Sequence, residues 1–184
     1  MRKFIIAILI VTNILILGGC VQIPNFFKVS DSNVNKIGLK YQKNLIKSIN
    51  ESDEELLKSL FSEDKLSGID DINAGIEYIF SLFDEELTNI KYDKSISSGK
   101  TFGSVGYINT IDIYFDVFHK GEHYMIHIDA CSYDMDNPKN EGIYKIAVLP
   151  VKDDESEEKF YSACRIWRNG IYHPGWDVDL ENEQ

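Results

Sequence analysis

Apolar residues recur every three or four positions up to about residue 86, and every second position after it. Spacings of three and four place side chains on one face of a helix, so we predict helices over residues 31–49, 52–61 and 69–83. Their apolar positions are Val34, Ile37, Tyr41, Leu45 and Ile49, then Leu56, Leu57, Leu60 and Phe61, and then Ile69, Ile72, Ile76, Ile79, Phe80 and Phe83.

The start of the second helix has its own signal. Ser52 is followed three residues later by Glu55, which is the spacing of a capping box. Polar and small residues at 64–68 then predict a loop before the third helix.

Two alternating segments, 110–119 and 122–131, predict a β-hairpin around the two-residue turn Lys120-Gly121. With that turn, His119 faces Glu122, and the apolar residues of the two strands meet on one face. A slip of one residue would destroy the match. This inward face could line a pocket, although isoleucine-rich faces more often form a core. It consists of Ile111, Ile113, Phe115, Val117, Tyr124, Ile126, Ile128 and Ala130.

Further strands are expected at 90–96 and 142–151, with a turn over 134–141 between the hairpin and the second of these. Residues 160–172 fit either a short helix or a last strand. Helices followed by strands predict an α+β fold, with three N-terminal helices packed on one face of a curved antiparallel sheet. We place this single domain at residues 32–176.

The N-terminus predicts export and lipid attachment. Arg2 and Lys3 precede an apolar run at 4–17, which is short for a membrane span but typical of a signal peptide. The string Leu17-Gly18-Gly19-Cys20 resembles a bacterial lipobox. The resemblance implies that Cys20 receives a diacylglyceryl group, that the chain is cut before it, and that the new amino terminus is often acylated.

We therefore expect a lipoprotein signal peptide at 1–19 and a lipidated tether at 20–31 before the domain, with an acidic tail at 177–184 after it. The alternative is an uncleaved transmembrane anchor. The predicted location is the extracytoplasmic face of the cell membrane.

Acidic residues outnumber Lys and Arg by 30 to 19, which gives a net charge of −11. So acidic a chain lacks the cationic surface that holds phosphate backbones, and we exclude nucleic acid as a partner. Removal of residues 1–19 would take away Arg2 and Lys3 but no acid, and the net charge would become −13. Anionic head groups repel such a domain, so its net charge predicts that it stands off the membrane.

Three cysteines are present, and the predicted lipid occupies one of them. Cys131 and Cys164 would both lie outside the cytoplasm, where they could form a disulfide. The alternative is two buried free thiols that pack as small apolar residues.

The second face of the hairpin carries weak candidates for a metal site. Asp112 would face Asp129, and His127 lies on the same face two residues away, so these three side chains could converge on one ion. A solvated sheet face explains the same residues, and no Cys-x-x-Cys or His-Glu-x-x-His string is present. We therefore predict no metal and no other cofactor.

The order of elements resembles the cone-shaped fold of the nuclear transport factor two superfamily, which includes ketosteroid isomerases. The strings 56–62, 142–146 and 170–171 also resemble a family of Gram-positive bacterial lipoproteins without an assigned activity, over most of residues 35–172. In isomerase-like members of the superfamily, acids and tyrosines lie among apolar walls. Here the inward face carries no carboxylate, and its polar groups are Tyr124 with Tyr41 or Tyr78 near it.

The sequence also lacks a Gly-x-Ser-x-Gly elbow, a phosphate-binding loop and a dinucleotide fingerprint. We therefore favour a non-enzymatic domain that binds a small apolar ligand or another envelope protein. One alternative is a cone-fold enzyme, either a hydrolase or an isomerase. Another is an accessory or inhibitory subunit whose acidic surface meets a basic envelope partner.

Overall fold

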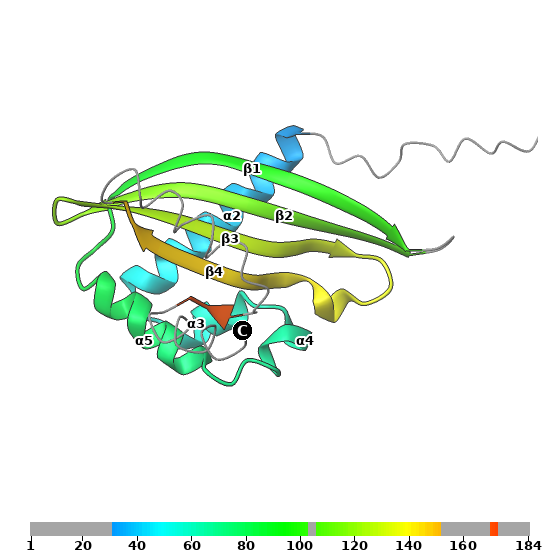
Figure 1. Cartoon of the computed structure of the whole chain (residues 1–184), viewed down its shortest axis with the longest axis horizontal. Coiled ribbons are helices and arrows are strands. Elements are labelled where there is room, and N and C mark those ends of the chain that lie inside the picture. Colours follow the sequence, from blue (N-terminus) through cyan, green and yellow to red (C-terminus); the bar gives the residue numbers. More distant parts are fainter. Residues whose placement is uncertain (1–30, 103–105, 152–169, 173–184) are drawn as a thin grey trace, which may run out of the picture.

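Five strands form one curved sheet in the order β1-β2-β3-β4-β5 (Figure 1). The computed structural model describes residues 31–102, 106–151 and 170–172. In this part of the chain, the α-helices come first and the strands follow, as predicted. The elements are α2 (Asp31–Asn50), α3 (Glu54–Ser59), α4 (Glu63–Leu66), α5 (Ile72–Leu82), β1 (Asn89–Phe102), β2 (Gly106–His119), β3 (Glu122–Asp134), the 3-10 helix η1 (Pro138–Asn140), β4 (Gly142–Pro150) and β5 (Gly170–Ile171).

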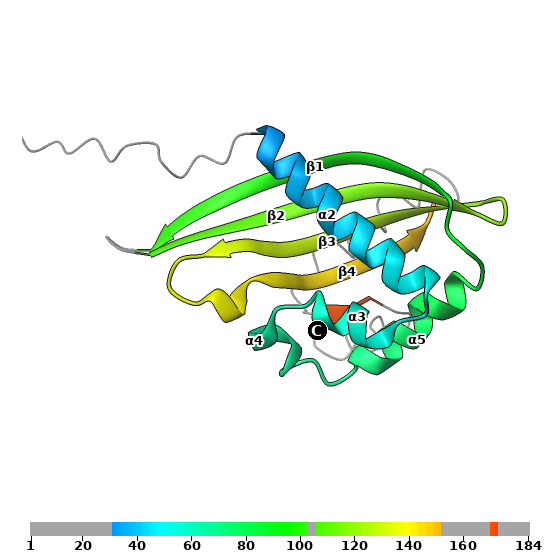
Figure 2. The same cartoon turned by 180° about the vertical axis from the view of Figure 1, so that it is seen from behind.

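Helix α2 crosses one face of the sheet diagonally, and α3, α4 and α5 lie beyond β4 on the side of β5 (Figures 1 and 2). The α+β class and the curved, mostly antiparallel sheet with N-terminal helices are confirmed. One pair departs from the antiparallel prediction, because β5 runs parallel to β4.

The predicted hairpin and its register are confirmed. His119 pairs with Glu122, Ile113 with Ile128, and the polar positions pair in the predicted order on the other face. Lys120 and Gly121 adopt φ values of 52° and 83°, and two positive values are what a type I′ turn requires. The alternation and the turn therefore specify the same register.

The inward face of the hairpin lies in the hydrophobic core. We call this face of the sheet, which α2 covers, the inner face. Its aliphatic and phenylalanine side chains are almost fully buried together with Leu45 and Ile49 of α2, while Tyr124 is partly buried against the same cluster. The buried residues of the inner face are Ile111, Ile113, Phe115, Val117, Ile126, Ile128 and Ala130.

The predicted capping box is wrong by one residue. Asp53 is the N-cap of α3, and its Oδ1 accepts a hydrogen bond of 2.8 Å from the backbone N–H of Leu56. Ser52 has a φ of 49° and belongs to the end of α2, where the backbone N–H of Asp53 donates to the carbonyl of Ser48. The Asp53 carboxylate thus takes the role that the spacing gave to Ser52.

The predicted loop at 64–68 is also wrong in part, because α4 begins at Glu63 and continues through Leu66. Ser62 caps this short helix and accepts from the backbone N–H of Lys65 at 3.3 Å. The strand expected at 90–96 is longer and reaches Phe102. The expected strand at 142–151 and the turn before it are confirmed as β4 and the connection that contains η1.

Several predictions lie outside the described residues. They are the signal peptide at 1–19 with its lipobox Cys20, most of the tether at 20–31, Cys164, and the tail at 177–184. Where the structure describes the chain, no helix is both long and apolar enough to cross a membrane.

Candidate functional site

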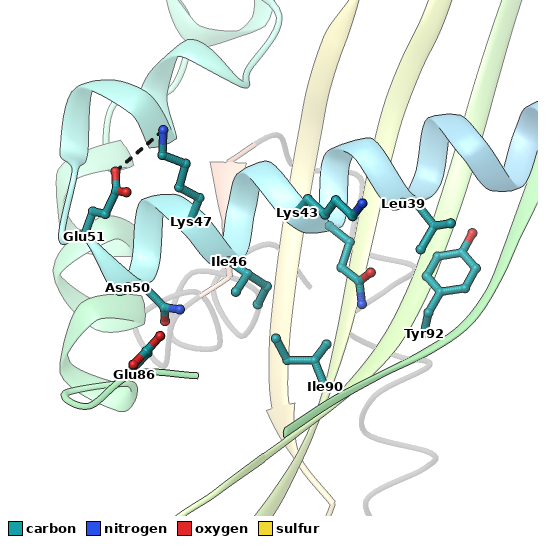
Figure 3. Close-up of a pocket in the computed structure, with 10 residues that line it drawn as sticks. Leu39, Lys43, Ile46, Lys47, Asn50, Glu51, Glu86, Ile90 and Tyr92 are labelled. Carbon is teal, nitrogen blue, oxygen red and sulfur yellow. Dashed lines mark ion pairs between the residues drawn. The ribbon is translucent and has the colours of Figure 1, made fainter. Parts of the chain in front are cut away.

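A groove of about 790 Å³ lies between α2 and β1 (Figure 3). Ile46 of α2 and Ile90 of β1 face each other across it, and Leu39 and Tyr92 extend this apolar lining toward one end. The volume falls within the range of small-molecule sites. The lining residues are Leu39, Gln42, Lys43, Ile46, Lys47, Asn50, Glu51, Glu86, Ile90 and Tyr92.

Helix α2 lies over β1 at its N-terminal end and then crosses away from this strand (Figure 2), and the groove lies between the two elements. They touch at Gly38, where an added Cβ would collide with the hydroxyl of Ser95 and lie 2.6 Å from that of Tyr92. The Tyr92 hydroxyl also donates to Asn35 Oδ1 of α2 at 3.3 Å and is hydrogen-bonded to Ser95. These contacts close one end of the groove.

The other end is closed by the connection between α5 and β1. Asn50, the last residue of α2, donates from Nδ2 to the carbonyl of Leu87 at 3.3 Å, and its Oδ1 accepts from the N–H of Leu87 at 2.8 Å. Asp84 in the same connection accepts from Lys120 Nζ at 2.6 and 2.7 Å, which ties it to the tip of the hairpin. The ammonium group of Lys120 lowers the pKa of the Asp84 carboxyl.

The groove combines an apolar lining with a charged rim. Lys43, Lys47, Glu51 and Glu86 are all exposed at its edge, and Lys47 lies 3.8 Å from Glu51. None of these four charged residues is buried, so a bound ligand can reach them from the open side of the groove. The arrangement suits a ligand that has both an apolar part and a charged group.

The groove is not the pocket that the hairpin pattern allowed for. The inner-face residues of β2 and β3 fill the core, and none of them lines the groove. Sequence analysis missed the groove because its walls come from the flank of α2 beside the predicted apolar stripe and from β1. The sequence does indicate the lysines at its edge. Lys36, Lys40, Lys43 and Lys47 recur at helical spacing on the face opposite the apolar stripe.

Of the tyrosines named as polar candidates, Tyr41 and Tyr124 pack against the core, and Tyr78 is partly buried. The Tyr41 hydroxyl donates to the backbone carbonyl of Cys131 at 3.4 Å, and burial raises the pKa of Tyr41 to about 12. Burial also raises the pKa of Tyr78 and of Tyr124. All three phenols are therefore neutral at ordinary pH and suit hydrogen bonding.

The opposite, outer face of the hairpin carries two similar pairs. His127 Nε2 lies 2.9 Å from Asp112 Oδ1, and His123 Nε2 lies 2.8 Å from Asp116 Oδ1. A carboxylate only accepts hydrogen bonds, so each Nε2 carries the proton. Each imidazole also stacks on the ring directly opposite, with centroids 4.7 Å apart for Tyr114–His127 and 4.5 Å for Phe118–His123.

The three weak metal candidates are thus only partly brought together. Asp112 and His127 form a direct hydrogen bond, and Asp129 lies in register with Asp112 on one side and with Lys145 on the other. No group of three or more potential metal ligands is found among the described residues. The pairing with His127 and the neighbouring Lys145 relieve the repulsion that two opposed carboxylates would otherwise have.

Cys131 is fully buried, and its thiol donates to the carbonyl of Tyr133 at 3.3 Å. Burial raises the pKa of this thiol, so it is a weak nucleophile. Its predicted partner Cys164 lies outside the described residues, and the disulfide stays a prediction.

A family model described as a domain of unknown function, DUF5104, matches residues 44–153. The chain belongs to this family. The match begins within α2 and includes Asn50, Ile90 and Tyr92 of the groove, while Leu39 and Lys43 precede it. No curated protein is similar to the DUF5104 chain.

Proposed function

We propose that this DUF5104 protein is a lipoprotein held through Cys20 on the extracytoplasmic face of the membrane, and that its domain binds a small anionic amphiphile in the groove between α2 and β1. The amphiphile is bound and not chemically changed. The observation that carries the ligand class is the pairing of an apolar lining with lysines at its rim.

The rim supports an anionic head group over a cationic one. Lys43 stands at the end of the groove where Leu39 and Tyr92 lie, and the next lysines along the helix, Lys36 and Lys40, border a second depression of about 360 Å³. The acidic residues Glu51 and Glu86 stand at the other end, next to Asn50 (Figure 3). An elongated ligand would place its anion at Lys43 and its apolar chain between Ile46 and Ile90.

The proposal includes the cone-like architecture suggested by the order of elements. A curved sheet with a long helix across its inner face supports that resemblance. Side chains of the inner face fill the space where a cone-shaped fold would have its cavity. We therefore place the binding site in the groove between α2 and the edge strand β1. This supports the binding function over the alternative of a hydrolase or isomerase.

The lipid anchor is tested with the Cys20→Ala variant of the full chain. We expect the parent protein to be cleaved before Cys20 and to carry lipid there, measured by mass spectrometry of its N-terminal peptide. The variant should keep residues 1–19 and gain no lipid. Identical cleavage and membrane association of both proteins would contradict the lipoprotein proposal.

Ligand binding is tested with two probes of equal chain length, dodecanoate and dodecyltrimethylammonium, by calorimetry in the absence of vesicles. We expect dodecanoate to bind and the cationic probe to bind more weakly. Lys43→Glu replaces one attraction of about 1 kcal/mol by a similar repulsion, which weakens dodecanoate binding roughly 10- to 30-fold.

The matched control is Lys91→Glu, which makes the same charge change on the outer side of β1, in register with Asp116. This variant should bind dodecanoate like the parent. Equal affinity for the two probes, or equal loss in the two variants, would show that the groove does not select an anion.

A further inference from the structure

Helix α2 carries a cationic face in an otherwise acidic chain. Residues 33–50 contain four lysines and no carboxylate, whereas the whole chain has a net charge of −11. The lysines are separated by four, three and four positions, which places them on one side of the helix over about 16 Å of its length. We call Lys36, Lys40, Lys43 and Lys47 the lysine face.

This face points away from the sheet. All four lysines are exposed, whereas Val34, Leu45 and Ile49 on the other side of α2 are buried in the core. Helix α2 lies on the outside of the molecule in the view from behind (Figure 2). A flat anionic surface could therefore approach along the whole helix without a change of fold.

Intramolecular pairing leaves most of this charge available. Lys47 lies 3.8 Å from Glu51, and both side chains are more than half exposed. Lys36, Lys40 and Lys43 have no ion-pair partner within the described part of the chain. The depression of about 360 Å³ lies among these three lysines and offers a place for a head group.

We propose that the lysine face docks the DUF5104 domain onto the anionic lipid head groups of the membrane that carries its anchor. The inference rests on the proposed lipidation of Cys20. Ten residues lie between Cys20 and Asp31, so the two are eleven Cα–Cα steps apart and the segment spans at most about 40 Å. The helix that follows the anchor is thus held within reach of the lipid surface.

Net charge alone predicts that the domain stands off the membrane, but the position of the lysines changes this expectation. A chain with a net charge of −11 is repelled on average by anionic lipid. The attraction of lysines to the lipid acts within about one Debye length of the surface, so it depends on which face of the domain is turned toward the membrane. With the lysine face toward the membrane, residues 33–50 present four lysines and no carboxylate to the lipid. The groove shares Leu39 and Lys43 with the depression and would then open beside the lipid surface.

The test uses the full lipidated chain in vesicles of phosphatidylcholine alone or mixed with phosphatidylglycerol. A water-soluble amine-reactive ester modifies exposed lysines, and mass spectrometry measures the extent at each one. We expect modification of Lys36, Lys40 and Lys43 to fall about fivefold or more in the anionic vesicles and to recover at high salt. Lys91, on the other side of the sheet, should react equally in both and serves as the internal control.

Two double variants with equal charge change complete the test. Lys36 and Lys40 do not line the groove. The variant Lys36→Gln/Lys40→Gln should therefore abolish the protection of Lys43 while weakening dodecanoate binding far less than Lys43→Glu does. Lys91→Gln/Lys94→Gln should leave the protection unchanged. Equal modification in the two vesicle types, or equal effects of the two double variants, would overturn the docking proposal.

The outcomes separate this inference from the proposed function. Absence of lipid on Cys20 in the mass spectrum would contradict the proposed lipid anchor. Membrane docking would then be measured by whether the same chain floats with each of the two vesicle types. Binding to the anionic vesicles alone would support docking, and flotation with neither type would overturn it. Dodecanoate binding is measured without vesicles, so its failure would count against the groove and not against docking.

Discussion

Gly38 of α2 lies against Ser95 of β1 so closely that a Cβ on the glycine would collide with the serine hydroxyl. This is the point from which helix and strand diverge, and the groove begins beyond it. The absence of a side chain at Gly38 therefore determines how closely α2 approaches the edge of the sheet.

The first prediction is that Gly38→Ala lowers the free energy of unfolding by about 1–2 kcal/mol. Alanine is the better residue within a helix by roughly 0.5–1 kcal/mol, but overpacking at this contact costs about 1–3 kcal/mol and breaks the hydrogen bond between Tyr92 and Ser95. Urea unfolding of the parent and the variant measures the difference.

Two further variants test this explanation. Ser95→Ala removes the hydroxyl that collides, so Gly38→Ala should be less damaging in that background. Gly68→Ala is the control, because its Cβ would lie 3.7 Å from the carbonyl of Lys65, an ordinary contact. A Gly38→Ala protein as stable as the parent would show that the helix and strand do not meet as described.

The second prediction compares the same Ile→Asp substitution at a buried position and at an exposed one. Ile113 is 0% exposed beside Ile128, whereas Ile96 on β1 is 50% exposed. Ile113→Asp places a charge in the core and should cost several kcal/mol, while Ile96→Asp should cost about 1 kcal/mol or less. Thermal melts of both variants provide the comparison, and similar shifts would mean that the faces of the sheet are assigned wrongly.

The register of the hairpin was predictable because two local signals agree. Alternating apolar residues define the faces, and Lys120-Gly121 permits the positive φ values of the turn. The start of α3 was predictable only within one residue, because Ser52 and Asp53 are both good caps and the end of α2 takes Ser52 into the left-handed region. Which of the two residues caps α3 depends on how α2 ends, and the capping pattern carries no information about that.

The groove could not be predicted in the same way. Its walls are Ile46 and Ile90, which are far apart in the sequence and face each other only because α2 crosses the sheet diagonally. The crossing depends on the close contact at Gly38, and a lone glycine within a helical pattern does not reveal what approaches it. The lysine face, in contrast, follows directly from the spacing of Lys36 and the three lysines after it.

The third prediction concerns the closed end of the groove. Asn50 exchanges two hydrogen bonds with the backbone of Leu87, so Asn50→Ala leaves both backbone groups without this partner. We expect a loss of about 1–2 kcal/mol in the free energy of unfolding and faster hydrogen exchange at the Leu87 amide. Asn73→Ala, at an exposed position of α5, is the matched control and should change neither measurement. Unchanged exchange at Leu87 in the Asn50 variant would contradict the described closure.

The fourth prediction is a pH dependence from Asp134 in the connection between β3 and β4. Its Oδ2 accepts a hydrogen bond of 2.7 Å from Asn140 Nδ2. Its Oδ1 accepts hydrogen bonds of 3.0 Å from the backbone N–H groups of Asp136 and Asn137. These bonds lower the pKa of the Asp134 carboxyl, and the bond from Asn140 has the largest effect. A pKa lower in the folded state than in the unfolded state stabilises the fold above about pH 4, and this contribution is lost as the pH falls through the folded value. Asp134→Asn should therefore cost about 1 kcal/mol at neutral pH, with the difference from the parent shrinking toward pH 2–3. Urea unfolding from neutral pH to pH 2–3 measures the difference in the free energy of unfolding between the variant and the parent. Asp136→Asn, at an exposed position, is the control. A difference that is the same at every pH would mean that the Asp134 carboxylate does not stabilise this connection.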